Sequence, residues 1–172
     1  LGAAGGATNT PLGTVGSGTT VASGATLDLN GYTLGTAEAL TLNGTGVGGT
    51  AGALANSSGT TVTYSGLLTL GSDATVNATG SITLSNAGTI TGSGSTLTLA
   101  GTATGSSMAS ILGTVAGGLT KTGTGTWTLS GASTYTGGTT ISAGTLKLGA
   151  AGGATNTPLG TVGSGTTVAS GA

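Results

Sequence analysis

The segment Leu1–Ala25, at the start of the chain, recurs without a single change as Leu148–Ala172. The identity sets a repeat period of 147 residues. Self-similarity at a fixed period is typical of architectures in which each unit packs against its neighbours. We therefore interpret residues 1–147 as one complete unit and residues 148–172 as the start of the next, in one continuous structure without a separate domain. Flanking copies of the same unit are the first expected partners.

A shorter pattern recurs inside the unit, in which an apolar residue, a polar residue and a leucine follow one another. In a strand the first and third side chains share one face, and the middle one points to the other. We expect the apolar pairs to point inward, toward a common core, and the polar residues to point outward. The predicted core residues are Leu27, Leu29, Leu40, Leu42, Leu68, Leu70, Ile82, Leu84, Leu97, Leu99, Trp127, Leu129, Leu146 and Leu148.

The spacing of this motif predicts stacked coils rather than hairpins. The shortest intervals, such as that from Leu27 to Leu40, are too short for a full turn of three strands, so we interpret them as two faces of one coil. The prediction is an all-β parallel β-helix, or β-solenoid, with about six coils per unit. Asn30-Gly31 and several single glycines mark corners, and Asn9-Thr10-Pro11 predicts a turn at the join between units. Two Gly/Ala/Ser-rich stretches, Gly44–Ser58 and Gly101–Ser110, are expected to be loops that leave the coil.

The stretch Gly117–Leu146 carries the most specific signal. It contains Leu119-Thr120-Lys121-Thr122-Gly123, then Tyr135-Thr136-Gly137-Gly138-Thr139-Thr140, and ends on Ala143-Gly144-Thr145-Leu146. These residues resemble the autotransporter-associated β-strand repeat, also called the passenger-associated transport repeat. The resemblance implies a right-handed parallel β-helix in the passenger of a secreted bacterial surface protein, and hence an extracellular location.

Composition excludes several classes of partner. Only 3% of the residues are charged, and the cations are two lysines, too few for the basic surface that nucleic acid or anionic lipid requires. No run approaches the ~18 apolar residues of a membrane-spanning helix. The chain has no Cys and no His, and no Asp follows its Gly-Gly pairs as in calcium-binding β-rolls. We therefore expect no cofactor, no metal site and no insertion of this segment into a membrane.

The few ionisable residues give little scope for catalysis. An acid–base pair of Asp28 and Glu38 is an alternative, but no third polar residue accompanies it. We expect no catalytic residue and no enzyme activity. Lys147 and Asp28 of the next unit occupy the middle position of successive motifs and would form an exposed ion pair. Lys121 matches a lysine of the family motif, and its stem is expected to pack along the coil.

The aromatic residues have structural interpretations. Trp127 is expected in the core by its place in the motif, and Tyr32, Tyr64 and Tyr135 as corner or surface residues.

The favoured function is a structural segment of an extracellular bacterial fibre, stalk or filament, with lateral association into bundles as a further expectation. An adhesin that binds host or glycan surfaces is the alternative. Ice binding by threonine ladders is a third candidate, since Thr-x-Thr triplets begin at residues 61, 89, 96 and 126. An outer-membrane barrel or silk-like stacking fits less well, because the strands are short and poor in aromatic residues and the spacings are uneven.

Overall fold

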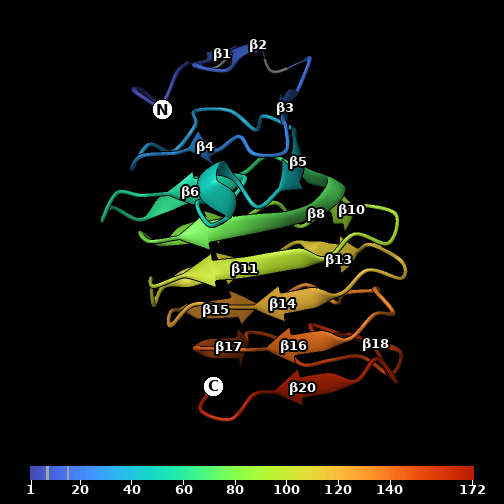
Figure 1. Ribbon diagram of the computed structural model, residues 1–172. Coiled ribbons are helices and arrows are strands. Elements are labelled where there is room, and N and C mark those ends of the chain that lie inside the picture. Colours follow the sequence, from blue (N-terminus) through green and yellow to red (C-terminus); the bar gives the residue numbers. More distant parts are fainter. Residues whose placement is uncertain (7, 15) are drawn as a thin grey trace.

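The computed structural model describes residues 1–6, 8–14 and 16–172, and over these the chain winds into a three-sided parallel β-solenoid (Figure 1). The chain descends from the N-terminus, and the strands on the near side of Figure 1 run from right to left, which makes the solenoid right-handed. The predicted fold class is therefore confirmed, with about six turns. The only helical element in the described residues is the short 3-10 turn η1 (Val47–Gly49).

The three sides are called face 1, face 2 and face 3. Face 1 contains β3 (Thr19–Val21), β5 (Leu40–Gly44), the first part of β8 (Leu68–Ala78), β10 (Thr89–Thr91) and β13 (Ile111–Gly113). Face 2 contains β4 (Leu27–Asp28), β6 (Leu54–Asn56), the second part of β8, β11 (Leu97–Gly101), β14 (Leu119–Lys121), β16 (Thr139–Ile141) and β20 (Thr166–Val168). Face 3 contains β7 (Val62–Tyr64), β9 (Ile82–Leu84), β12 (Ser106–Met108), β15 (Thr126–Leu129) and β17 (Thr145–Leu148).

Strand β8 links faces 1 and 2 because it bends around a corner. Its residues Leu68–Leu70 pair with β5, whereas Val76–Ala78 pair with β6. The bend lies at Gly71–Asp73, where all three residues are exposed. Face 1 and face 2 are therefore two separate columns of strands that share this one long element.

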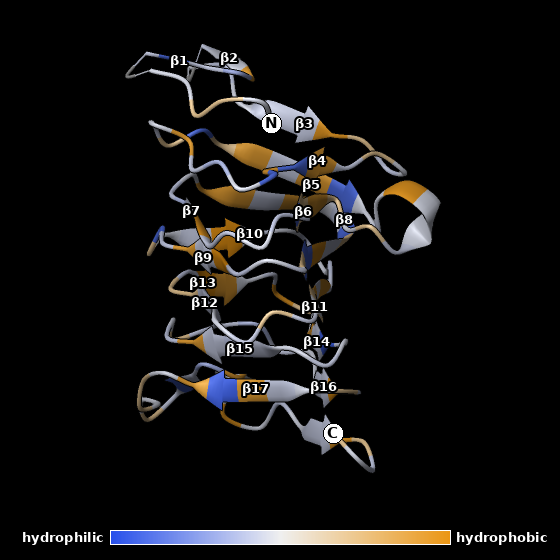
Figure 2. Cartoon of the chain, turned by 90° about the vertical axis from the view of Figure 1, so that its left-hand side faces the viewer, coloured by the Kyte–Doolittle hydropathy of each residue, from blue (hydrophilic) through white to orange (hydrophobic). Residues whose placement is uncertain are grey.

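The length of a turn varies along the stack. The turn from Trp127 to its partner Leu146 is much shorter than the turn from Leu40 to its partner Leu68. The longer turn contains η1, which projects from the stack beside β8 (Figure 2). All seven copies of the apolar-polar-Leu motif begin on strands, although Leu29 lies just past the end of β4, and the short interval from Leu27 to Leu40 joins face 2 to face 1 as expected.

The two predicted loops were only partly correct. Gly44–Ser58 contains β6, whose three residues are all buried, and Gly101–Ser110 contains β12. Both strands are built from small side chains around one larger residue, Leu54 or Met108, so they lack the leucine pair that marks the other strands. A coil with small inward side chains still stacks, because the neighbouring coils supply the apolar bulk.

Each copy of the repeated segment carries an antiparallel hairpin. In the first copy β1 (Asn9–Thr10) pairs with β2 (Gly13–Thr14), and in the second β18 (Asn156–Thr157) pairs with β19 (Gly160–Thr161) in the same register. The expected turn at Pro11 and at Pro158 is confirmed. The main ladders of all three faces are parallel.

Glycine corners let successive coils approach closely. A Cβ on Gly66 would overlap the carbonyl oxygen of Glu38, and one on Gly80 would overlap that of Ser58. No other residue fits these positions without moving the coil above. The sequence marks such corners by glycine because the neighbouring backbone occupies the space of a side chain.

Eleven of the fourteen predicted core residues are buried, namely Leu29, Leu40, Leu42, Leu68, Leu70, Ile82, Leu84, Leu97, Leu99, Trp127 and Leu129. Leu27 and Leu146 are partly buried and pack against this core. Leu148 does not match its prediction, because its side chain is 52% exposed. It lies at the end of β17, the last strand of face 3, where a coil covers it from the β15 side alone.

Candidate functional site

The charged residues do not form one site. Asp28 is on the outer side of face 2, where its carboxylate accepts hydrogen bonds from the backbone N–H groups of Asn30 (2.9 Å) and Ser57 (3.0 Å) and from Ser57 Oγ. Partial burial raises the pKa of Asp28, but these hydrogen bonds outweigh it and hold the pKa below its usual value. No hydrogen bond joins Asp28 to Glu38, so the structure does not support the acid–base pair.

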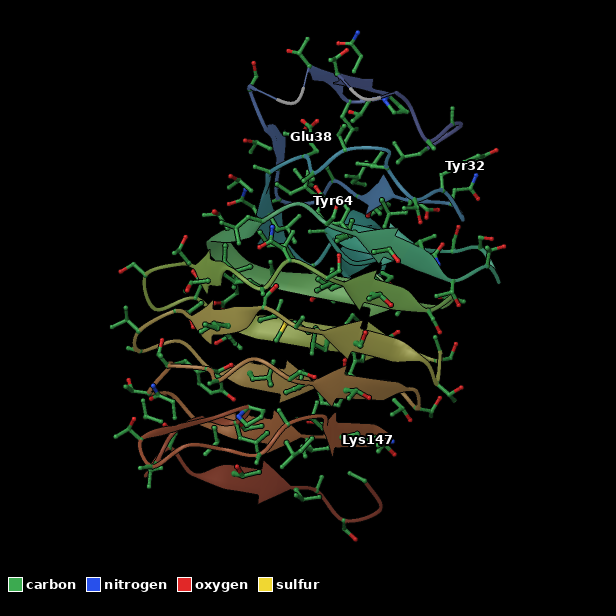
Figure 3. All side chains as sticks on the ribbon, turned by 180° about the vertical axis from the view of Figure 1, so that it is seen from behind. Tyr32, Glu38, Tyr64 and Lys147 are labelled. Carbon is green, nitrogen blue, oxygen red and sulfur yellow. The ribbon has the colours of Figure 1, made fainter. Side chains whose placement is uncertain are left out.

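Glu38 lies inside the solenoid, near the N-terminal end, and is 1% exposed (Figure 3). Its two carboxylate oxygens accept hydrogen bonds from the hydroxyls of Thr10 (3.2 Å) and Thr19 (3.0 Å). Both threonines belong to the repeated segment Leu1–Ala25. Glu38 therefore ties the first copy of the repeated segment to the first coil, a role that the sequence alone did not reveal.

Lys121 points into the solenoid, where its side chain is fully buried. It lies in register with Leu99 on one side and Ile141 on the other. Its ammonium group donates to the carbonyl oxygens of Thr122 (2.5 Å), Gly123 (2.7 Å) and Ala143 (3.2 Å). Burial lowers the pKa of Lys121. The lysine acts as an internal clamp that joins the ends of two successive coils.

The aromatic residues differ in part from expectation. Trp127 is in the core, 1% exposed, and donates from Nε1 to the carbonyl oxygen of Ala100 (3.1 Å). Tyr64 and Tyr135 are also buried, which corrects their interpretation as corner or surface residues. Both hydroxyls have internal partners, the carbonyl of Glu38 for Tyr64 and the hydroxyl of Thr139 for Tyr135. Tyr32, 39% exposed, lies at the periphery (Figure 3).

Because two tyrosines are buried, the solenoid should lose stability in alkali. Burial raises the pKa of Tyr135 to about 12, while the hydrogen bond with Thr139 opposes the shift. The folded state then holds this proton more tightly than the unfolded chain, so the contribution to stability is complete below pH 10 and is lost as pH rises to 12. Two pH units correspond to about 2–3 kcal/mol. Burial raises the pKa of Tyr64 as well, with the same sign, whereas the lowered pKa of Lys121 acts in the opposite direction.

Urea unfolding between pH 9 and pH 12 measures this effect. The variant Tyr135→Phe should show a flatter decline than the wild type, and Tyr32→Phe should follow the wild-type curve. Parallel curves for all three proteins would contradict the assignment.

A groove lies on the outside of face 2. It has a volume of about 600 Å³ and lies between the segment around η1 and the outer surface of β8, β11 and the end of β14. Its lining residues are Thr45, Gly49, Thr50, Thr75, Asn77, Thr79, Thr98, Ala100, Gly101, Thr102, Thr122 and Gly123. Asn77 Nδ2 donates to the carbonyl of Thr50 (3.0 Å) and so holds one wall to the floor.

The groove offers hydroxyl, amide and backbone groups but no charge and no aromatic ring. Its lining holds threonine hydroxyls but no side chain that would act on them as a general base at neutral pH. Among the described residues, no cluster of three or more His, Cys, Asp or Glu exists that would hold a metal ion. What the groove provides is hydrogen bonding to a neutral polar ligand. The sequence did not reveal the groove, because one wall is the segment around η1, which leaves its coil, and the floor is formed by strands of three different coils.

The Thr-x-Thr triplets are spread over the solenoid. Thr61-Val62-Thr63 and Thr126-Trp127-Thr128 are on face 3, Thr89-Ile90-Thr91 on face 1 and Thr96-Leu97-Thr98 on face 2. Ice binding needs such triplets aligned on one flat face, so the structure does not support that interpretation.

These features define a parallel β-solenoid with an apolar core and an exterior poor in charge. Within it, residues 119–148 match the family model of the passenger-associated-transport-repeat. The match begins with β14 and ends with β17, and includes the clamp Lys121 and the core residue Trp127. Neither the curated proteins nor the solved structures gave a significant match to the chain. The repeat and the fold together fit a structural segment of an autotransporter passenger, and the repeat family indicates a surface or secreted protein.

In the described residues, no helix has the length and apolar character needed to cross a bilayer.

Proposed function

We propose that the chain is a structural segment of an extracellular bacterial stalk or filament built from tandem copies of the 147-residue unit. The observation that carries this proposal is the unbroken parallel ladder of face 2, which runs from β4 to β20 and thus from one unit into the next. Backbone hydrogen bonds along the axis give such a rod stiffness, because each coil is bonded to the coils above and below it.

The exterior supports the same proposal. Outward threonines follow one another up face 2, in the order Thr75, Thr98, Thr120, Thr140 and Thr167. The surface has very few charges, so neighbouring rods repel one another weakly and are able to associate side by side. Catalysis has no part in this function, which is mechanical.

The length of tandem proteins tests the proposal. Proteins of one, two and four units, examined by small-angle X-ray scattering and electron microscopy, should lengthen by about 30 Å per unit at constant cross-section, since stacked strands lie ~4.8 Å apart. Single chains whose width grows with the number of units, or that become compact, would contradict it. The one-unit protein serves as the reference for the cross-section.

Adhesion is a second candidate, which the groove on face 2 favours. Its threonines and Asn77 present hydrogen-bonding groups without charge, which suits neutral carbohydrate hydroxyls. Binding of the tandem protein to an array of neutral glycans tests this function. Thr98→Val in the groove should weaken any binding, and Thr128→Val on face 3 is the matched control.

A further inference from the structure

The two copies of the repeated segment occupy different faces of the solenoid. In the first copy, Thr19–Val21 pair with Leu40–Leu42 and so begin the column of face 1. In the second copy, the identical residues Thr166–Val168 pair with Thr139–Ile141 and so end the column of face 2. One sequence therefore joins face 2 of one unit to face 1 of the next.

Counting the sides of the solenoid along the chain also places the two copies of the repeated segment on different faces. From β3 to β17 the chain completes six three-sided coils, if the irregular sides are included. Residues 32–34 form one irregular side, on face 3, where the Thr33 hydroxyl accepts a hydrogen bond from the backbone N–H of Thr63 in β7 (2.9 Å). Residues 133–135 form the other, below Leu112. The hairpin β18–β19 then adds one more side before β20 begins the next unit. Each unit thus contains six coils and one further side.

The two copies show the two flanks of one junction. The hairpin of the second copy rests on Tyr135, whose carbonyl accepts from the backbone N–H of Thr161 (3.0 Å). The hairpin of the first copy is tied to Glu38 through Thr10. The hairpins share their register and the backbone contacts Gly6 N–H to Asn9 O and Gly153 N–H to Asn156 O, each 2.7 Å. One hairpin can therefore make both sets of contacts if the Thr157 hydroxyl turns from Gly160 O, which it meets here, to Glu38 of the next unit.

We propose that consecutive units join head to tail with an offset of one third of a turn, so that each unit presents a given face on the next side of the three-sided rod. The occupant of the exposed end below β17 and β20 is the first coil of a second copy of the unit. This inference rests on the proposed tandem stalk.

Three contacts follow from the offset. Leu1, which is equivalent to Leu148, donates from its backbone nitrogen to the carbonyl of Asp28. Because the same donation, from Leu27 N–H to Ala53 O, accompanies the pair Leu27 and Leu54, Leu148 would pair with Leu29 of the next unit, which accounts for its exposure here. Lys147, exposed on β17, would lie beside the outward carboxylate of Asp28 of the next unit, as the sequence predicts.

The third contact is a threonine column. On face 1, Thr20, Thr41, Thr69 and Thr91 stand in register. Thr20 is equivalent to Thr167, the last threonine of the face 2 column. In the tandem protein the two columns would form one ladder that passes from face 2 to face 1 at every junction. The segment around η1 and the adjoining groove would return to the same side only after three units, about 90 Å along the axis.

Introduced cysteines test the offset in a two-unit protein, since the chain has no Cys of its own. Thr140→Cys with Thr167→Cys places two thiols in register on neighbouring coils of face 2. The second pair is Thr167→Cys with Thr41→Cys of the second unit. Its two thiols should also lie in register on neighbouring coils, because the equivalent residues Thr20 and Thr41 do so in the first unit. Both pairs should react with a short thiol-to-thiol crosslinker in high yield.

The pair Thr134→Cys with Thr167→Cys tests the competing arrangement, in which units join without an offset. Thr134 lies on the last side of the face 1 column. A unit with a whole number of coils would place Thr167 below Thr134 and crosslink that pair instead. That result, or no crosslink in either predicted pair, would overturn the offset. Scattering on the same protein reports its length, so a failure of the stalk itself is seen separately as the absence of elongation.

Discussion

Replacing Trp127 by alanine is expected to destabilise the solenoid by about 3–5 kcal/mol, because the change removes the largest side chain of the core and leaves a cavity. Trp127 stands in one inward column of face 3, between Ser106 on the coil above and Leu146 on the coil below. Ser106 is small, so the indole supplies most of the apolar volume at this level. The variant also removes the donor to Ala100 O.

Urea unfolding followed by circular dichroism measures the change, since tryptophan fluorescence disappears with the residue. Trp127→Phe should cost less than the alanine variant, because the phenyl ring fills part of the space. Tyr32→Ala is the matched control on an exposed aromatic residue and should stay within about 0.5 kcal/mol of the wild type. An alanine variant as stable as this control would show that packing of Trp127 in the core contributes little to the free energy of unfolding.

The strands that the sequence predicts well are those whose inward positions carry two large apolar residues. Leu40-Thr41-Leu42 and Ile82-Thr83-Leu84 show the alternation of a half-buried strand, and both are strands with buried first and third residues. In β12 the inward residues are Ser106 and Met108. A serine beside a tryptophan is a good core residue only because of its neighbours, so no pattern within the strand predicts it.

The arrangement of the coils depends on contacts that no local pattern contains. The turn from Leu40 to Leu68, which holds η1, is much longer than the turn from Trp127 to Leu146, so spacing alone does not assign a strand to a face. The groove arises because the segment around η1 leaves its coil and lies beside the outer surface of three following coils. The offset of one third of a turn is visible only when the pairing of both copies of the repeated segment is known.

The interior charges were equally hard to place from sequence. Charged residues are almost never fully buried without partners, and the partners of Glu38 and Lys121 come from neighbouring coils. Thr10 lies 28 residues before Glu38, and Ala143 lies 22 residues after Lys121. The family motif marks the position of Lys121 but does not say which way its side chain points.

Replacing Lys121 by methionine is expected to destabilise the protein by about 2–4 kcal/mol, although methionine has nearly the same length and is apolar. The thioether cannot donate, so the partly buried carbonyls of Thr122, Gly123 and Ala143 lose their shared partner. The removal of a buried charge offsets part of this loss. The remainder is the penalty for the unpaired carbonyls.

Lys147→Met is the matched control, because Lys147 is the other lysine of the chain and is exposed on β17. In the one-unit protein it should change the free energy of unfolding by no more than about 0.5 kcal/mol. Hydrogen exchange adds a local readout, in which Lys121→Met should speed the exchange of backbone amides around residues 122–125 and 142–145, where two coils meet. Equal stabilities for the two variants would contradict the clamp.

The pH dependence of stability separates the clamp from simple packing. The pKa of Lys121 is lower in the folded protein than in the unfolded chain, so the unfolded state binds more protons in the window between the folded pKa and 10.5. This group therefore makes stability rise with pH through that window. Lys121→Met should abolish this rise and leave the alkaline loss due to the tyrosines in place. A variant that unfolds more easily but keeps the wild-type pH profile would mean that Lys121 contributes by its volume and not by its charge.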